Sequence, residues 1–166
     1  MKSDPLVLAV SGVKNSGKTR LIEALLPLLA ARGVQTAVVK HDGHRFTPDA
    51  PGTDSFRFFA AGAVGSAVFD GEKFSLTRRV QVNENALIAQ FPEANLVLLE
   101  GFKDSAWPKL ELVRAAVGTA TVCDARTVAA YVSDLPLQAD RPVFGPDDFN
   151  EIADFIAAAV GEARHA

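Results

Sequence analysis

Hydrophobic and polar positions along the first forty residues follow a pattern that predicts a strand, a helix and a second strand. Two apolar runs of strand length occupy residues 6–10 and 36–40. Between them lie leucines at helical spacing, namely Leu21, Leu25, Leu28 and Leu29. Gly33 follows at the position where a helix commonly ends. The segment therefore predicts a crossover unit whose two strands run parallel.

The middle of the chain predicts a loop followed by a small helix and a hairpin. Residues 41–54 carry two prolines and two glycines without apolar periodicity, which is typical of a long functional loop. A short helix is expected over residues 54–62. Strand-like segments at 64–71 and 73–80 then flank the dipeptide Asp70-Gly71, which favours a turn between two antiparallel strands.

The second half returns to alternating strands and helices. Its pattern predicts a helix, three strands and a closing helix, at residues 83–91, 95–101, 109–114, 127–134 and 146–163. The run at 95–101 is almost entirely aliphatic, so we expect a strand buried on both faces at the centre of a parallel sheet. Asp147 or Asp148 is expected near the N-cap of the closing helix. These elements predict an α/β fold.

Length and composition favour one globular domain spanning residues 1–166. The chain has 166 residues, of which 48% are hydrophobic and 22% charged, close to the globular average. A net charge of −3 gives no attraction to a nucleic-acid backbone. No apolar run has the length of a membrane span, and the lone Cys123 cannot form an internal disulfide. We therefore expect a cytoplasmic protein that binds neither nucleic acid nor membrane.

The segment SGVKNSGKTR at residues 11–20 matches the phosphate-loop motif G-x-x-x-x-G-K-[ST] at every fixed position, through Gly12, Gly17, Lys18 and Thr19. It lies between a predicted strand and a predicted helix, as the motif requires. Backbone N–H groups of such a turn surround a polyphosphate, Lys18 neutralises the outer phosphate oxygens, and Thr19 offers a hydroxyl to Mg²⁺. The predicted nucleotide-binding residues are Gly12, Val13, Lys14, Asn15, Ser16, Gly17, Lys18, Thr19 and Arg20.

Lys14 occupies a variable position of the motif. It is either a solvated side chain on the outer surface of the loop or an extra cation near the phosphates. The motif predicts a three-layer P-loop NTPase fold with a mostly parallel central sheet flanked by helices, together with a possible antiparallel hairpin.

A magnesium site needs acidic groups at the ends of neighbouring strands. Glu100 ends the aliphatic run and Asp42 follows the strand at 36–40, so Thr19, Asp42 and Glu100 are the predicted metal ligands. The alternatives are a solvated charge at a strand end for Glu100 and a loop carboxylate for Asp42. His41 and His44 lack a third ligand at zinc spacing, which favours a polar loop role for both.

Five further segments carry a family resemblance. They are GVKNSGKTRLIEALLPLLAARG, VVKHDGHRF, PGTDSFRFFAAGA, LVLLEGFKDSAWPKLELVR and AYVSD. In this order they resemble the molybdopterin-guanine dinucleotide biosynthesis protein B (MobB) family over nearly the whole chain. The resemblance implies a cytoplasmic, homodimeric, GTP-binding accessory protein with weak Mg²⁺-dependent GTPase activity.

The resemblance also implies partners and site residues. The partner would be the guanylyltransferase that attaches GMP to molybdopterin, and molybdopterin itself is a further candidate ligand. Gly12 to Thr19 would bind the phosphates of GTP, and Thr19, Asp42 and Glu100 would bind Mg²⁺. Four more residues lie in matching motifs without an assigned role, namely Asp54, Arg57, Lys103 and Arg114.

The chain has no N-K-x-D sequence, the motif with which ordinary GTPases recognise guanine. Asp134, at the end of the strand predicted over 127–134, is the best substitute, and its alternative is a plain turn residue. No catalytic residue can be identified, and the lack of an obvious glutamine to orient water agrees with slow hydrolysis.

Two other functions compete with a GTP-binding adapter. A small-molecule kinase would use Lys18 together with arginines to stabilise a transferred phosphoryl group, and it would need an arginine-rich lid, for which residues 72–80 are the candidate. The candidate arginines are Arg45, Arg57, Arg78 and Arg79. Alternatively, the phosphate loop is a relic in a structural protein.

Overall fold

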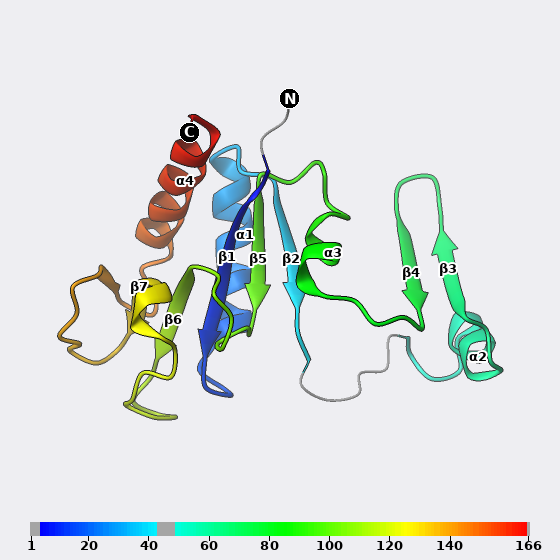
Figure 1. Cartoon of the computed structure of the whole chain (residues 1–166), viewed down its shortest axis with the longest axis horizontal. Helices are drawn as coiled ribbons and strands as arrows, with labels where there is room; N and C mark the ends of the chain where they lie inside the picture. The colour runs from blue at the N-terminus through cyan, green and yellow to red at the C-terminus, as the bar shows by residue number, and fades with distance from the viewer. Residues whose placement is uncertain (1–3, 43–48, 166) are drawn as a thin grey trace. The chain divides into compact units, whose positions relative to one another are not determined.

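The computed structural model describes residues 4–42 and 49–165 and divides the chain into two compact units. The first consists of Met1–His41 and Glu84–Ala166, and the second of Asp42–Asn83. Figure 1 gives the order of the elements along the chain. Residues 43–48, which include His44 and Arg45, lie outside the described residues.

The first unit is built on a six-stranded sheet in the order β2-β5-β1-β6-β7-β8, and every neighbouring pair runs parallel. The strands are β1 (Leu6–Gly12), β2 (Thr36–Lys40), β5 (Leu96–Glu100), β6 (Lys109–Val113), β7 (Val128–Ser133) and β8 (Val143–Phe144). The parallel sheet predicted from the sequence is thereby confirmed. Since all strands point the same way, the residues that follow β1, β2, β5, β6 and β7 emerge at one edge of the sheet.

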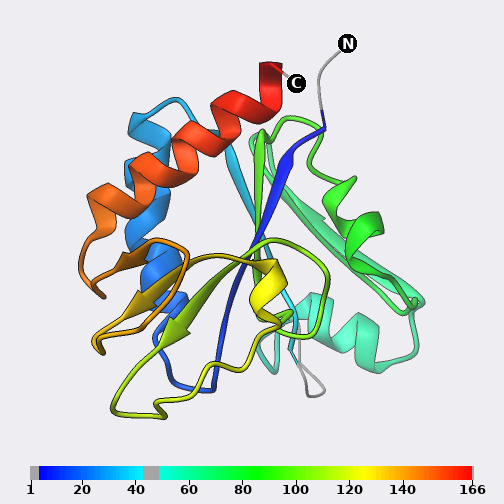
Figure 2. The ribbon, with the colours of Figure 1, turned by 60° about the vertical axis from the view of Figure 1, so that its left-hand side comes forward.

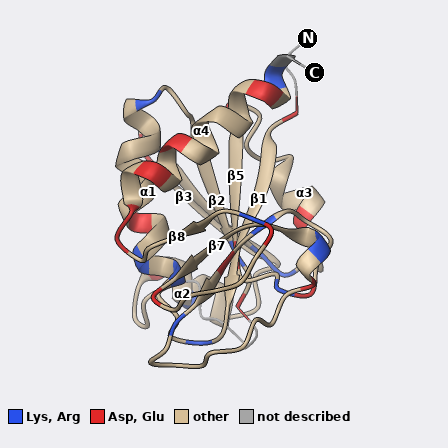
Figure 3. Cartoon of the chain, turned by 90° about the vertical axis from the view of Figure 1, so that its left-hand side faces the viewer, with Lys and Arg blue, Asp and Glu red and all other residues tan. Residues whose placement is uncertain are grey.

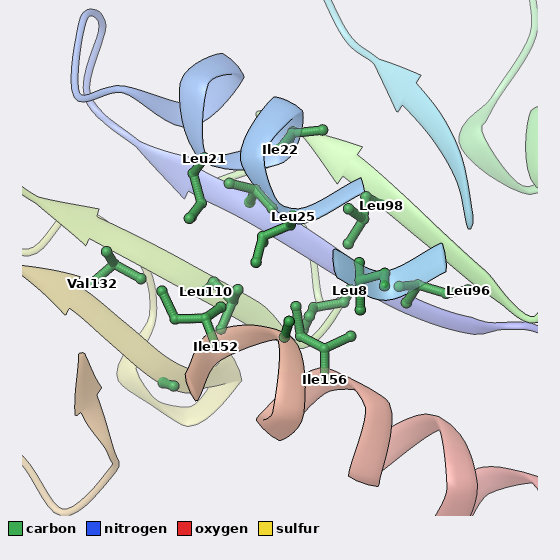
Figure 4. Packing of buried hydrophobic residues seen from close by; sticks show 14 of the residues in the cluster. Leu8, Leu21, Ile22, Leu25, Leu96, Leu98, Leu110, Val132, Ile152 and Ile156 are labelled. Carbon is green, nitrogen blue, oxygen red and sulfur yellow. The ribbon is translucent and has the colours of Figure 1, made fainter. Parts of the chain in front are cut away.

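Helices cover both faces of this sheet and make three layers. Helices α1 (Lys18–Ala31) and α4 (Phe149–His165) lie on one face, and the short α3 (Glu84–Ile88) lies on the other (Figure 2). Leu21 and Leu25 of α1 and Ile152 and Ile156 of α4 belong to one cluster with Leu98 and Leu110 of the sheet (Figure 4). This cluster is the largest hydrophobic core of the unit.

The central strands are apolar because both of their faces are covered. Leu96, Val97, Leu98 and Leu99 of β5 are fully buried, with alternate side chains in the cores on opposite faces. The continuous aliphatic run at 95–101 therefore forms the interior strand that the sequence predicts, paired with both β1 and β2.

Ion pairs join α1 to α4 at both ends of α1. Arg20, in the first turn of α1, bonds Asp147 just before α4 at 2.7 Å, and Arg32, at the C-cap, bonds Asp154 of α4 at 2.7 Å. Both signs of charge occur along the two helices (Figure 3). Helix α4 begins directly after Asp148, one of the two residues predicted near its N-cap.

The second unit contains α2 (Asp54–Ala60) and the antiparallel pair of β3 (Gly65–Phe69) and β4 (Phe74–Arg78). The hairpin predicted around Asp70-Gly71 is confirmed. Its turn is fixed by Asp70, whose Oδ1 accepts the backbone N–H groups of Glu72 at 2.8 Å and Lys73 at 2.9 Å.

Two features of the chain complete the fold. The two-residue strand β8 was not expected from the sequence, because it is too short to show a periodic pattern. Within the part of the chain that the structure describes, no helix is both long enough and apolar enough to cross a lipid bilayer.

Candidate functional site: the phosphate loop at the end of β1

The loop between β1 and α1 has a backbone that depends on glycine. Gly12 has φ +144° and Gly17 has φ +94°, and Asn15 between them also has a positive φ of 63°. A Cβ on Gly12 would lie 2.6 Å from the carbonyl oxygen of Leu112 and 2.9 Å from Oγ of Ser16. The loop can therefore pass this close to β6 only because position 12 has no side chain.

Lys18 turns its ammonium group back over the loop. Its Nζ donates hydrogen bonds to the carbonyl oxygens of Gly12 at 3.2 Å and Val13 at 2.7 Å. Burial lowers the pKa of Lys18, and the nearby carboxylate of Glu100 opposes that shift. The cation is thus held at the loop by backbone oxygens and placed where an anion would be neutralised.

Ser16 contributes a polar atom without a partner. Its side chain is only 2% exposed, and its Oγ has no hydrogen bond to any of the described residues. A buried hydroxyl is normally paired, because an unpaired one costs about 1–3 kcal/mol. This hydroxyl is enclosed beneath the loop, 2.9 Å from the point where a Cβ on Gly12 would stand.

Glu100 faces the loop from the end of β5. The Thr19 hydroxyl donates to its Oε1 at 2.8 Å, and Lys40 Nζ lies 3.2 Å from the same oxygen. The register of β2 against β5 places Lys40 directly beside Glu100. One hydroxyl and one carboxylate thus meet at the mouth of the loop, which is the donor set that Mg²⁺ would share with phosphate oxygens and water.

Hydrogen bonds to β1 and β2, the strands on either side, hold the end of β5 in place. Gly101 N–H donates to the Val10 carbonyl at 3.0 Å, and His41 N–H donates to the Glu100 carbonyl at 3.2 Å. The Ser11 hydroxyl donates to the Gly101 carbonyl. These contacts tie Glu100 to β1 and β2 and so set its position relative to the loop.

The other predicted residues are distributed around this centre. Lys14 is exposed on the loop. The guanidinium of Arg20 bonds Asp147 and lies 5.3 Å from the ring centroid of Phe149. Asp42 is exposed and belongs to the second unit, so its metal role stays a prediction.

Asp134 follows β7 at the same sheet edge and binds its neighbours with both oxygens. Its Oδ2 accepts from Nε of Arg114 at 3.0 Å, and its Oδ1 accepts from the Ala115 N–H at 2.8 Å. The base-recognition role predicted for Asp134 stays a prediction, but the structure gives this carboxylate a defined partner in Arg114.

The residues proposed for a kinase lid are part of the hairpin unit. Residues 72–80 contain β4, and Arg79 donates to the Phe59 carbonyl at 2.6 Å and the Ala63 carbonyl at 3.3 Å. Arg57 pairs with Asp54 at 3.5 Å within α2. Arg57 and Arg79 thus have partners inside the second unit.

Sequence reasoning missed two buried charged residues in β6, the strand that pairs with β1. Lys109 is fully buried and donates to the carbonyls of Ser105 at 2.5 Å and Trp107 at 2.7 Å. Glu111 is also fully buried, and its Oε1 accepts the N–H groups of Val122 and Cys123. Their signal was present only as two charges on alternate positions of a predicted strand, a pattern that usually indicates a solvated face.

Across residues 4–42 and 49–165, no three His, Cys, Asp or Glu side chains are grouped so that they could hold a metal ion. The predicted magnesium site is of a different kind, with Thr19 and Glu100 at the phosphate loop.

Comparison with known proteins connects this arrangement to one family. Residues 7–134 match the family model described as MobB, molybdopterin guanine dinucleotide synthesis protein B. The chain is 33% identical over 160 residues to the molybdopterin-guanine dinucleotide biosynthesis adapter protein of Escherichia coli, covering 90% of each chain. It is 33% identical over 154 residues to the protein of the same name from Haemophilus influenzae, covering 90% of this chain and 86% of that protein.

Solved structures agree with the sequence comparisons. The crystal structure of Bacillus subtilis MobB superposes with a TM-score of 0.77 at 29% identity, covering 92% of this chain and 96% of the other. A MobB homologue from Bacillus stearothermophilus superposes with a TM-score of 0.68 at 27% identity, covering 94% and 98%.

Proposed function

Because the chain belongs to the MobB family, we propose that it is an adapter in molybdopterin-guanine dinucleotide biosynthesis that binds GTP with Mg²⁺. Its accessory role follows from the adapter proteins to which it is related. The partner in this proposal is the guanylyltransferase that attaches GMP to molybdopterin, with molybdopterin as a further candidate ligand.

The observation that supports nucleotide binding is the glycine-dependent loop at the end of β1, whose lysine is already in place. Gly12 and Gly17 both have positive φ, and Lys18 is held by the carbonyls of Gly12 and Val13. Phosphate oxygens would accept hydrogen bonds from the Lys18 ammonium group and from the loop N–H groups together.

Magnesium is proposed at Thr19 and Glu100. In this arrangement Thr19 Oγ1 and Glu100 Oε1, now 2.8 Å apart, would face the ion from the loop and from β5. Mg²⁺ bound there would neutralise charge on the phosphates, while Lys40 would stay beside the carboxylate at the strand end.

Hydrolysis is proposed to be slow. Oε1 of Glu100 is engaged by both Thr19 and Lys40, which suits a carboxylate that holds a cation better than one that takes a proton from water. Nucleotide occupancy, rather than turnover, would then be the state that the partner enzyme detects.

Calorimetric titration of GTP and ATP, each with and without Mg²⁺, tests this function. We expect GTP to bind more tightly than ATP and Mg²⁺ to strengthen binding. Lys18→Ala should lower GTP affinity about a hundredfold, because it removes charge-assisted hydrogen bonds to phosphate. Lys73→Ala, which removes an exposed lysine paired with Asp70, is the matched control and should bind as the parent does.

Two results would overturn the proposal. The first is a Lys18→Ala variant that binds GTP as tightly as the parent. The second is rapid GTP turnover by the isolated chain on a small-molecule acceptor, which would favour a kinase. Repeating the titration with the guanylyltransferase present separates an adapter from an unrelated nucleotide-binding protein, since only an adapter should change affinity or turnover in that mixture.

A homodimer is proposed from the second unit considered by itself. One face of the hairpin carries Ala67, Phe69, Phe74 and Leu76, with Phe69 81% and Phe74 74% exposed. A two-stranded hairpin is marginally stable alone, and both of its edges can pair with another strand. A second copy of the chain, bringing the same apolar face, is the occupant that the family resemblance suggests.

A further inference from the structure

We propose that Arg114 contacts the α- and β-phosphates of the bound nucleotide and that Asp134 is the positioning residue that holds Arg114 in place. This inference rests on the proposed nucleotide binding and adds to the phosphate loop a cation that lies outside its motif. Asp134 then acts through Arg114 rather than on the base.

The sheet brings Arg114 to the phosphate loop. Strand β6 pairs in parallel with β1, with Leu112 opposite Gly12, and Arg114 follows the last residue of β6. Arg114 therefore leaves the sheet at the same edge as the loop. Its Nη1 lies 3.8 Å from the point where a Cβ on Gly17 would stand.

Gly17 marks the part of the loop that meets the inner phosphates. It is the N-cap of α1, with φ +94°, and directly precedes Lys18. In loops of this type the backbone N–H groups surround the α- and β-phosphates, while the lysine reaches the β- and γ-phosphates. A guanidinium beside Gly17 is thus placed at the inner phosphates.

Asp134 fixes the orientation of that guanidinium. Its Oδ2 accepts a hydrogen bond from Nε of Arg114 at 3.0 Å, and its Oδ1 accepts one from the Ala115 N–H at 2.8 Å. The hydrogen bond from the Ala115 N–H is the main cause that lowers the pKa of Asp134, and the hydrogen bond from Arg114 is the second. The carboxylate is therefore charged at neutral pH.

The remaining nitrogen atoms of Arg114 can serve a second anion. An arginine side chain carries five N–H donors in a planar fork, so it can bond a carboxylate along one edge and a phosphate at another. The Arg114 side chain is 27% exposed, which leaves it accessible to a ligand.

Competition binding with three ligands tests the proposal, using GDP, inorganic pyrophosphate and guanosine against a fluorescent GDP analogue. Arg114→Ala should weaken GDP and pyrophosphate by about ten- to hundredfold and leave guanosine unchanged, since a charge-assisted bond to phosphate is lost. Asp134→Ala should weaken the same two ligands less strongly. The double variant should resemble Arg114→Ala, because the two residues act as one unit.

Arg32→Ala is the matched control. Arg32 is a similarly half-buried arginine, paired with Asp154 at the other end of α1, and its loss should change none of the three affinities. Thermal unfolding of each variant, followed by circular dichroism, shows whether it is folded at the temperature of the binding assay.

The outcomes separate this inference from the function on which it rests. If Lys18→Ala lowers GDP affinity and Arg114→Ala changes it by less than twofold, the inference is wrong and nucleotide binding stands. If Asp134→Ala weakens guanosine and leaves pyrophosphate unchanged, Asp134 recognises the base and the inference is also wrong. If Lys18→Ala has no effect, the proposed function itself fails.

Discussion

The Thr19 hydroxyl donates a 2.8 Å hydrogen bond to Oε1 of Glu100, although the two residues are 81 positions apart in the sequence. The parallel pairing of β1 with β5 creates this contact, because it brings the start of α1 and the end of β5 to one edge of the sheet. Sheet topology therefore brings together the two oxygen atoms at which we propose that Mg²⁺ binds.

Glu100→Gln should remove most of the effect of Mg²⁺ on GTP binding. The amide oxygen can still accept from Thr19, so the fold should persist, but the charge that attracts the cation is gone. We expect the ratio of GTP affinities with and without Mg²⁺ to fall about tenfold, measured by calorimetry.

Glu23→Gln, an exposed change on α1, is the control for that measurement and should keep the parental ratio. A Glu100→Gln variant with an undiminished Mg²⁺ effect would mean that another group holds the ion.

Gly12→Ala should destabilise the first unit and abolish nucleotide binding. The added Cβ would lie 2.6 Å from the Leu112 carbonyl oxygen, on a backbone with φ +144°. Strain and crowding together should cost about 2–5 kcal/mol of unfolding free energy, measured by urea denaturation.

Gly33→Ala separates the two causes. Gly33 also has a positive φ, +73°, but nothing lies within 4 Å of its added Cβ. This variant should lose only about 1–2 kcal/mol and should still bind GTP. Equal losses in the two variants would show that contact with β6 is not what requires glycine at position 12.

The sequence predicts those parts of the site whose signals are local. The phosphate-loop motif specifies Gly12 to Thr19, and the aliphatic run ending in Glu100 specifies an interior strand with an acid at its end. Each signal lies within one continuous segment, so no knowledge of strand order is needed to read it.

Contacts that depend on strand order could not be predicted in the same way. Lys40 meets Glu100 only because β2 pairs with β5 in that register, and Arg114 meets Asp134 only because β6 lies beside β7. The segment KLELV looks like a strand with one solvated face. Instead, Lys109 and Glu111 are buried, because backbone groups of Ser105, Trp107, Val122 and Cys123 supply their partners.

Cys123 should react slowly with alkylating reagents in the folded protein. Burial is the main cause that raises the pKa of its thiol from 9.0 to about 12, and the nearby Glu111 carboxylate is the second. At pH 8 the thiolate fraction is then roughly a thousandfold below that of an ordinary cysteine. Iodoacetamide labelling followed by mass spectrometry should be slow in buffer and fast in guanidinium chloride, and rapid labelling of the folded chain would contradict this.

The same shift should make the protein less stable in alkali. Between pH 9 and 12 the unfolded chain has lost the Cys123 proton while the folded chain retains it, so unfolding free energy falls as pH rises through this range. Cys123→Ala should flatten that decline in urea denaturation curves. Equal slopes in the parent and the variant would show that the thiol does not contribute.

Replacing both phenylalanines of the exposed hairpin face should convert the proposed homodimer into a monomer. Phe69 and Phe74 face each other across β3 and β4, and both are largely exposed in the described chain. Burying two such rings against a second copy would contribute several kcal/mol to association, at about 1.5–3 kcal/mol for each ring. Phe69→Ser/Phe74→Ser should therefore sediment as a monomer at concentrations where the parent sediments as a dimer.

Val117→Ser, which removes an exposed apolar side chain from the first unit, should leave the dimer intact. A parent chain that stays monomeric at high concentration would contradict the proposed dimer.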